Sequence, residues 1–391
     1  SKGLGYIKFM QFRFTDDQIM ISDTADAFLS EVSSSQAVRS AMATEWGYDD
    51  EVWGRMVEEM AWTGTHVPEF FGGLSLGYVE LTIILEQMGR YLFCSPFYSS
   101  VCLAQNALLI AGSESQKSEY LKRLIAGERG TLAYTSGGHA WDSGAVEAIF
   151  EQEKDGFLLN GDYKFVIDGH TADWLIVAAR ESRGGRLALF ILNSAQNGVT
   201  KKWQPTLDQT RKQARVILKD TKVSSDSLLG EAGDSSVLLE VILDLAAIGV
   251  AADQLGGAQK ALDLAVDFSL DRAQFGRQIG SFQAIKHKAA DMMLKVESAR
   301  SALYYAACIA DQVFKKDTSY DQLKEAASIA KAYCSDAYFF VTGSAIQIHG
   351  GVGFTEEYDI QLYFKRAKST ETFLGNAIWH RDRLAKSLLD D

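Results

Sequence analysis

The chain has 391 residues, 47% of them hydrophobic, and a formal net charge of −12 at pH 7. A chain of this length can bury a large core and is long enough for two or three structural units. It contains no run of five or more lysines and arginines, so it lacks the phosphate-neutralising surface that nucleic-acid binding needs.

The cysteine, histidine and apolar patterns exclude further classes of protein. The four cysteines form no CxxC pair and the six histidines fall in no HExxH spacing, so neither a disulfide framework nor a metal site is predicted. The most apolar stretch, 237–252, is interrupted by Glu240 and Asp244 and falls short of the roughly 18 uncharged residues of a membrane span. Residues 1–9 lack an apolar h-region and an A-x-A site, and we interpret them as leader or added sequence before Met10. We therefore expect a cytoplasmic protein.

Residues 10–129 are predicted to form an N-terminal helical domain. Their apolar residues recur at helical spacing, as in Val79, Ile83 and Met88. The loop "PEFFGGLSLG" interrupts this pattern at 68–77.

Residues 130–230 have a different texture, with short β-rich runs such as "TLAYT", "YKFVI" and "WLIVAA". Glycine, aspartate and asparagine punctuate these runs, as in strands joined by turns. We predict a middle antiparallel β domain.

Residues 231–391 return to helical periodicity and are predicted to form a four-helix-type bundle. The apolar positions of one long helix share a face: Phe282, Ile285, Ala289, Met293, Val296, Ala299 and Leu303. With only three prolines and no flexible linker, the three units should pack as one protomer of the α+β class.

Two loops of the last unit have residues suited to a phosphate-containing cofactor. In "DRAQFGRQIGSFQAIKH" (271–287), the guanidinium of Arg272 could hold a pyrophosphate beside Phe275 and Gln283. In "QIHGGVGFTEEY" (347–358), Gly350 and Gly351 could expose backbone N–H groups beside Gln347. Both loops also have an explanation without a ligand. The first could be an ordinary interhelical loop with solvated arginines, and the second a tight glycine turn. The absence of GxGxxG and of a preceding strand excludes a Rossmann site.

Together these loops and "VPEFFGGLSLGYVELTIILEQMGR" (67–90) resemble the acyl-CoA dehydrogenase family over nearly the whole chain. The resemblance implies the family's fold: an N-terminal helical domain, a middle β domain and a C-terminal helical bundle. It also implies FAD, an acyl-CoA substrate and oxidation between the α and β carbons. In the family, a carboxylate removes the α proton and the flavin accepts the hydride, and electron-transfer flavoprotein or a similar acceptor reoxidises the flavin.

The resemblance fails where the family carries its catalytic glutamate. That position, directly before the glycine of the last loop, is Leu374 before Gly375 here. The alternative position, on the helix before the Arg272 loop, aligns with Ala246. An aliphatic side chain cannot accept a proton, so no catalytic residue is assigned.

The flavin side of the β domain departs from the family as well. The family's Thr-Glu-Pro-Gly-x-Gly-Ser-Asp loop is "TSGGHAWD" here, with Thr135 retained and Trp141 in place of serine. The family's Trp-x-Thr is Phe165–Ile167, and isoleucine has no donor for the flavin N5.

By contrast, the residues that serve a neighbouring protomer's FAD in the family are retained. The cofactor-binding candidates are Arg272, Phe275, Gln283, Gln347, Gly350, Gly351 and Thr135. This asymmetry suggests the non-catalytic subunit of a heteromeric acyl-CoA dehydrogenase, with FAD at the interface with a homologous partner. The C-terminal sequence is similar to the bacterial α2β2 branch that acts on bulky acyl-CoA esters, including steroid side chains.

Three alternatives stay open at this point. One is a self-sufficient dehydrogenase, or homo-oligomer, with a displaced base at Glu371, Glu240 or Asp244. The second is a flavin monooxygenase of the same fold. The third is a structural subunit that contributes nothing to FAD binding.

Overall fold

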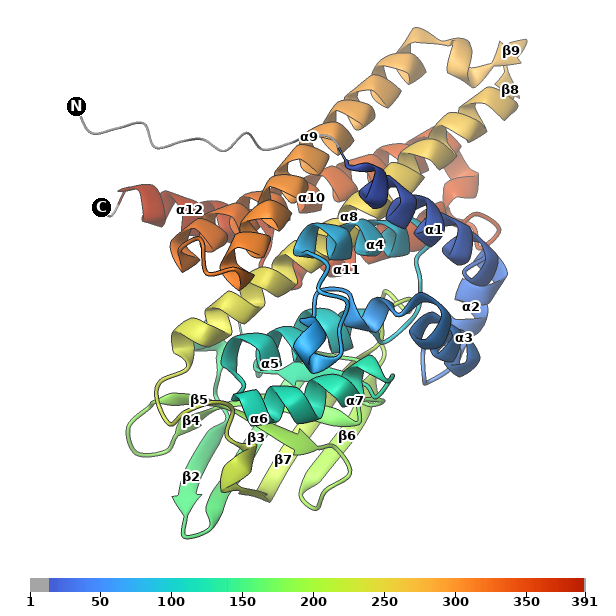
Figure 1. Ribbon diagram of the computed structural model, residues 1–391. Helices are drawn as coiled ribbons and strands as arrows, with labels where there is room; N and C mark the ends of the chain where they lie inside the picture. Colours follow the sequence, from blue (N-terminus) through green and yellow to red (C-terminus); the bar gives the residue numbers. More distant parts are fainter. Residues whose placement is uncertain (1–13, 139, 390–391) are drawn as a thin grey trace, which may run out of the picture.

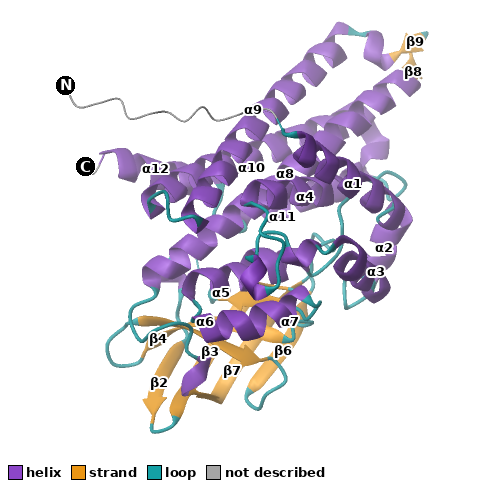
Figure 2. Cartoon of the chain, in the orientation of Figure 1, coloured by secondary structure: helices purple, strands orange, loops and turns teal. Residues whose placement is uncertain are grey.

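The computed structural model describes residues 14–138 and 140–389, so the expectation for residues 1–9 lies outside the described part. Helices, strands and helices follow one another in that order along the chain (Figure 1). The main sheet lies at the lower end of the molecule in this view, with most of the helices above it (Figure 2).

The N-terminal third is helical, as predicted. Its first helix begins with a capping box, in which Thr15 Oγ1 accepts from the backbone N–H of Gln18 at 3.2 Å and the Gln18 side chain accepts from Thr15 N–H. The helical segments are α1 (Asp16–Val32), α2 (Ser35–Ala43), α3 (Asp50–Arg55), η1 (Met56–Met60), η2 (Trp62–Gly64), η3 (Glu69–Phe71), α4 (Tyr78–Arg90), η4 (Tyr98–Gln105), α5 (Asn106–Ala111), α6 (Glu114–Gln116), η5 (Lys117–Leu121) and α7 (Lys122–Ile125).

The middle third forms one sheet with the order β1-β4-β2-β3-β7-β6, and β5 pairs with β4. Helices α5 to α7 lie across one side of it (Figure 1). The elements are β1 (Gly130–Ala133), η6 (Ser143–Ala145), β2 (Ile149–Glu153), β3 (Gly156–Ile167), β4 (Trp174–Glu181), β5 (Leu187–Asn193), β6 (Val199–Gln204), β7 (Gln213–Ser224) and η7 (Ser225–Ser227).

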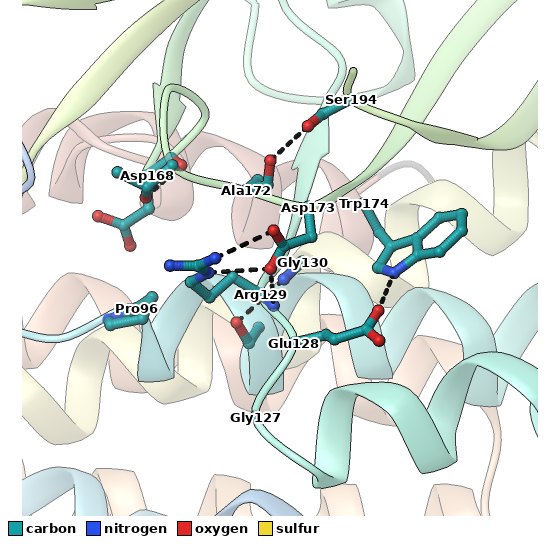
Figure 3. Close-up of polar contacts among 12 residues, drawn as sticks. Pro96, Gly127, Glu128, Arg129, Gly130, Asp168, Ala172, Asp173, Trp174 and Ser194 are labelled. Atoms are coloured by element: carbon teal, nitrogen blue, oxygen red, sulfur yellow. Dashed lines mark hydrogen bonds and ion pairs between the residues drawn. The ribbon is translucent and has the colours of Figure 1, made fainter. Parts of the chain in front are cut away.

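The sheet is mostly antiparallel, as predicted, but two of its strand pairs are parallel. Strand β4 runs parallel to β1 and to β2. An ion pair joins the starts of β1 and β4, the first of these pairs: Arg129 Nε and Nη2 contact the two carboxylate oxygens of Asp173 at 2.9 and 3.0 Å (Figure 3). Such long-range pairing leaves no trace in local periodicity.

The C-terminal third is the predicted helical bundle. Its elements are α8 (Ser236–Asp271), β8 (Ala273–Gln274), β9 (Arg277–Gln278), η8 (Ile279–Ser281), α9 (Gln283–Phe314), α10 (Tyr320–His349), η9 (Gly350–Phe354), α11 (Ile360–Thr372) and α12 (Ala377–Leu389). Helix α8 is buried on all sides along 241–258, as expected of a central helix.

One predicted core position of α9 is wrong. Met293 is 59% exposed, whereas its neighbour Met292 is fully buried. The first turns of α9 extend with the β8–β9 hairpin beyond the body of the molecule (Figure 1), so continuous core contact begins only near Met292.

Candidate functional site

The first group of candidate residues lies on the projecting hairpin between α8 and α9. Arg272 and Gln283 are exposed, and Phe275 at the tip is 92% exposed. Phe275 and Gly276 adopt positive φ angles of 54° and 80°, which close the turn. The backbone N–H of Ile279 donates to Arg272 O at 2.8 Å. The hairpin therefore presents a free guanidinium on a defined backbone.

The second group lies at the end of α10, where it contacts α8 and α9. Gln347 Oε1 accepts a hydrogen bond from Lys288 Nζ of α9 at 2.7 Å. His349 stacks on Phe268, in the last turns of α8, with ring centroids 4.3 Å apart. The ends of α8 and α10 and the start of α9 thus meet at one end of the bundle.

The glycine turn after Gln347 is open. Gly350 ends α10 with φ 65°, a conformation that favours glycine. A Cβ added at Gly350 or Gly351 would meet nothing within 4 Å, and both residues are exposed. This geometry leaves the backbone of the glycine turn open to a ligand such as a phosphate or nucleoside group.

Thr135, the remaining candidate, lies in the β domain after β1, away from the projecting hairpin. It is buried, and its Oγ1 accepts from the backbone N–H of Gly137 at 3.1 Å. The structure therefore divides the candidate residues into a hairpin group and one β-domain residue.

A cavity of about 310 Å³ lies between the β domain and α11. Its lining residues are Trp141, Phe165, Thr206, Leu207, Asp208, Gln213, Lys368, Ser369, Thr372 and Phe373. Its aromatic walls suit a flat ring. Ile167, at the position of the family's threonine, is buried, and its side chain can donate no hydrogen bond.

The position of the missing glutamate is occupied by a buried leucine in a firmly held turn. Leu374 is 3% exposed and has φ 58°. Its carbonyl accepts from Nε2 of His380 at 2.9 Å, and the carbonyl of Gly375 accepts from Lys331 Nζ at 2.9 Å. Burial lowers the pKa of Lys331 to about 7, whereas the carbonyls around its Nζ favour the ammonium form.

The displaced carboxylates proposed from the sequence have other partners. Glu371 pairs with Lys368 at 2.7 Å near the surface, and Glu240 accepts from Ser143 Oγ at 2.9 Å. Ala246 is buried in α8 and carries no acid. None of these arrangements positions an unpaired carboxylate to accept a proton.

Asp244 lines the same small cavity as Leu374, as Glu240 does, but unlike Glu240 it is buried. Burial raises its pKa, and Arg383 opposes that shift by donating from Nη2 to Asp244 Oδ2 at 2.9 Å. The carboxylate is therefore tied in an ion pair rather than free.

Sequence reasoning missed a buried ionic cluster next to the larger cavity. Arg366 of α11 contacts Asp208 Oδ2 at 3.1 Å and Asp253 Oδ1 at 2.9 Å, and all three side chains are at most 2% exposed. Arg211 also contacts Asp253 Oδ1, at 3.0 Å. Arg366 is 113 residues from Asp253 in the sequence, and Arg211 is 42 residues from Asp253, so no local motif reveals the cluster.

Within the described residues, no group of His, Cys, Asp and Glu is arranged to hold a metal ion. Nor is any helix of residues 14–138 and 140–389 long and apolar enough to cross a membrane.

Comparisons with known proteins identify the class to which this fold and these loops belong. Residues 15–128 match "Acyl-CoA dehydrogenase, N-terminal domain" and residues 236–389 match "Acyl-CoA dehydrogenase, C-terminal domain". The chain belongs to the acyl-CoA dehydrogenase family, whose members are FAD-dependent oxidoreductases.

Three relatives illustrate how closely the chain matches members of this family. The chain is 33% identical to acyl-CoA dehydrogenase IpdE2 of Mycolicibacterium smegmatis, covering 92% of this chain and 95% of that protein. It matches one chain in the structure of the ChsE4-ChsE5 complex of Mycobacterium tuberculosis with a TM-score of 0.87 and 25% identity. The match covers 98% of this chain and 100% of that chain. It matches a variant of the Tcur3481-Tcur3483 steroid ACAD with a TM-score of 0.85 and 26% identity, covering 96% and 98%.

Proposed function

We propose that this chain is the non-catalytic subunit of a heteromeric acyl-CoA dehydrogenase. Its partner would be a homologous subunit that carries the glutamate base and holds the flavin ring. The observation that carries the proposal is the buried Leu374 in the place of that base. A leucine can neither remove a proton from the α carbon nor stabilise the charge that develops there.

The residues present fit one half of FAD better than the other. Arg272 and Gln347 lie exposed at one end of the bundle, where a charge-assisted contact could hold the pyrophosphate of a partner's FAD. Gly350 and Gly351 would let the ADP portion approach the backbone. On the flavin side of this chain, where the resemblance places a threonine hydroxyl, the buried side chain of Ile167 can donate no hydrogen bond.

FAD, when bound, would supply the hydride acceptor for desaturation of the acyl group. In this proposal the hairpin positions that cofactor, and the partner's carboxylate removes the α proton of the acyl group. Electron-transfer flavoprotein or a similar protein would then reoxidise the flavin.

The substrate class follows from the relatives. Those named above include a two-protein complex and a steroid ACAD, which supports a bulky, steroid-like acyl-CoA as substrate. A site completed by two subunits also suits a bulky acyl group.

A substitution in the hairpin tests whether this chain contributes to the FAD site of the complex. Arg272→Ala should lower the FAD content of the purified complex at least tenfold, because a charge-assisted contact contributes about 1.5–3 kcal/mol. The matched control is Arg277→Ala in the same hairpin. The Arg277 guanidinium lies over the Phe282 ring at 4.1 Å, so the control should keep its FAD.

Equal FAD content in the two variants would show that Arg272 holds no cofactor, and the chain would then be a structural subunit. The FAD absorbance of each complex after gel filtration is the measurement.

Asp244 supports one second candidate, a self-sufficient enzyme, because it shares a cavity with Leu374. Steady turnover of an acyl-CoA by this chain alone, abolished by Asp244→Asn, would favour that candidate.

A further inference from the structure

Trp141 separates two cavities of very different size. The larger is the flavin-side cavity of about 310 Å³, which opens to solvent. The smaller, of about 10 Å³, is lined by Trp141, Asp142, Glu240, Leu243, Asp244, Ala247, Leu374, Trp379, His380 and Arg383. Among the described residues that line these cavities, Trp141 alone is common to both.

The smaller cavity is where a substrate would meet a base at position 374. A thioester whose α carbon came within reach of the Leu374 side chain would have to enter it. A single water needs roughly 10–15 Å³, so a cavity of about 10 Å³ has no room for an acyl chain.

The segment that carries Trp141 is tied to two other elements. Ser143 Oγ donates to Glu240 Oε1 of α8 at 2.9 Å, and Arg180 of β4 donates from Nη2 to Ser143 O at 2.7 Å. The indole itself packs edge-on against Phe373, with centroids 6.3 Å apart. The Trp141 side chain therefore forms a fixed wall of the larger cavity.

We infer that Trp141 is the specificity-determining residue that closes the acyl chamber of this chain. It leaves the flavin-side cavity open and cuts it off from the space beside Leu374. This inference rests on the proposed function, because it explains why an acyl group would be directed to the partner subunit. The loss of the base and the closure of the chamber are then two separate changes.

Binding of an acyl-CoA tests the closure without requiring turnover. Calorimetry on the full chain and on its complex gives the affinities for octanoyl-CoA and for free coenzyme A. The ratio of the two affinities measures how much the acyl group contributes to binding. For the isolated chain we expect a ratio near one. Trp141→Ala should raise it at least tenfold, because burying two or more methylenes contributes about 0.8 kcal/mol each.

Trp141→Phe is the matched control, because it keeps an aromatic wall and should keep a ratio close to that of the unaltered chain. A tenfold preference for octanoyl-CoA in the unaltered chain would overturn the inference. So would a Trp141→Ala variant that folds, as judged by circular dichroism, and shows no preference or no binding.

A thiol at position 374 gives a second, ligand-free readout. Leu374→Cys should react slowly with iodoacetamide when Trp141 is present and at least tenfold faster when combined with Trp141→Ala. Cys94, Cys102 and Cys334 add little background because they are buried and burial raises their pKa, whereas the partly exposed Cys308 is replaced by serine in both proteins. Equal labelling rates would contradict a closed chamber. Turnover by the unaltered chain alone would instead contradict the proposed function, so the two failures are distinguishable.

Discussion

Leu374 shows how much of the molecule depends on one turn. Its positive φ is unusual for a residue with a branched side chain, and buried groups hold it in place. His380 donates to its carbonyl, and Lys331 donates to the carbonyls of Thr370 and Gly375 at 3.0 and 2.9 Å. The scaffold of a catalytic turn is thus intact although it carries no acid.

The buried imidazole of His380 predicts acid sensitivity. Burial lowers its pKa to about 3, so between pH 6.5 and 3 the unfolded chain binds a proton that the folded chain does not. Stability should therefore fall with decreasing pH in this window, by about 1.4 kcal/mol per pH unit from this group. His380→Gln should flatten the pH dependence by that amount in urea unfolding between pH 6.5 and 4.5. Parallel curves for the two proteins would contradict this.

Glu371 is predicted to be dispensable for catalysis. Its carboxylate is near the surface and paired with Lys368, an arrangement worth less than about 1 kcal/mol. Glu371→Gln should leave acyl-CoA oxidation by the complex within about twofold of the unaltered value. A loss of a hundredfold or more would identify Glu371 as a displaced base.

At the scale of elements, the Arg366 cluster joins the two walls of the flavin-side cavity. Asp208 belongs to the loop between β6 and β7, and Asp253 belongs to α8. Arg366 precedes by one turn the α11 residues that line the opposite wall, Ser369 among them. One guanidinium therefore sets the distance between the β domain and the bundle.

Arg366→Met should be strongly destabilising. Removing one partner of a buried ion pair costs about 3–5 kcal/mol, because the buried carboxylate of Asp208 loses its arginine and that of Asp253 keeps only Arg211. Arg215→Met is the control: its pair with Asp162 is 44% and 41% exposed and should contribute less than about 1 kcal/mol. Hydrogen exchange should also accelerate at residues 205–213 in Arg366→Met. Similar unfolding midpoints for the two variants would be inconsistent with this cluster.

Local pattern predicted the elements better than their contacts. The order of helical, β and helical segments followed from periodicity, whereas the cofactor role of the two loops stays a prediction. The parallel pairing of β1 with β4 and the Arg366 cluster did not, because both join residues far apart in the sequence. Lys331 did leave a signal: a lysine among the small residues of "EAASIAKAYCSDA" is a charge on an apolar helix face. Met293 was misplaced because periodicity cannot tell where a helix leaves the core.

At the scale of the whole molecule, the two ends of the bundle differ in what they retain. The projecting hairpin keeps the residues suited to a cofactor held by another chain. Under the proposed function, the region around Leu374, Ile167 and Trp141 would lack the base, the hydrogen-bond donor for the flavin and the space for an acyl group. Such a one-sided difference is what a division of labour between two subunits predicts.

The central claim is best tested by FAD content and turnover of the chain alone and with its partner. The chain and the product of a neighbouring dehydrogenase-like gene would be purified separately and together, and acyl-CoA oxidation measured with an artificial electron acceptor. The account predicts little FAD and no turnover for this chain alone, with about one FAD per pair and activity in the complex. Nearly one FAD per chain, with turnover by this chain alone, would contradict it.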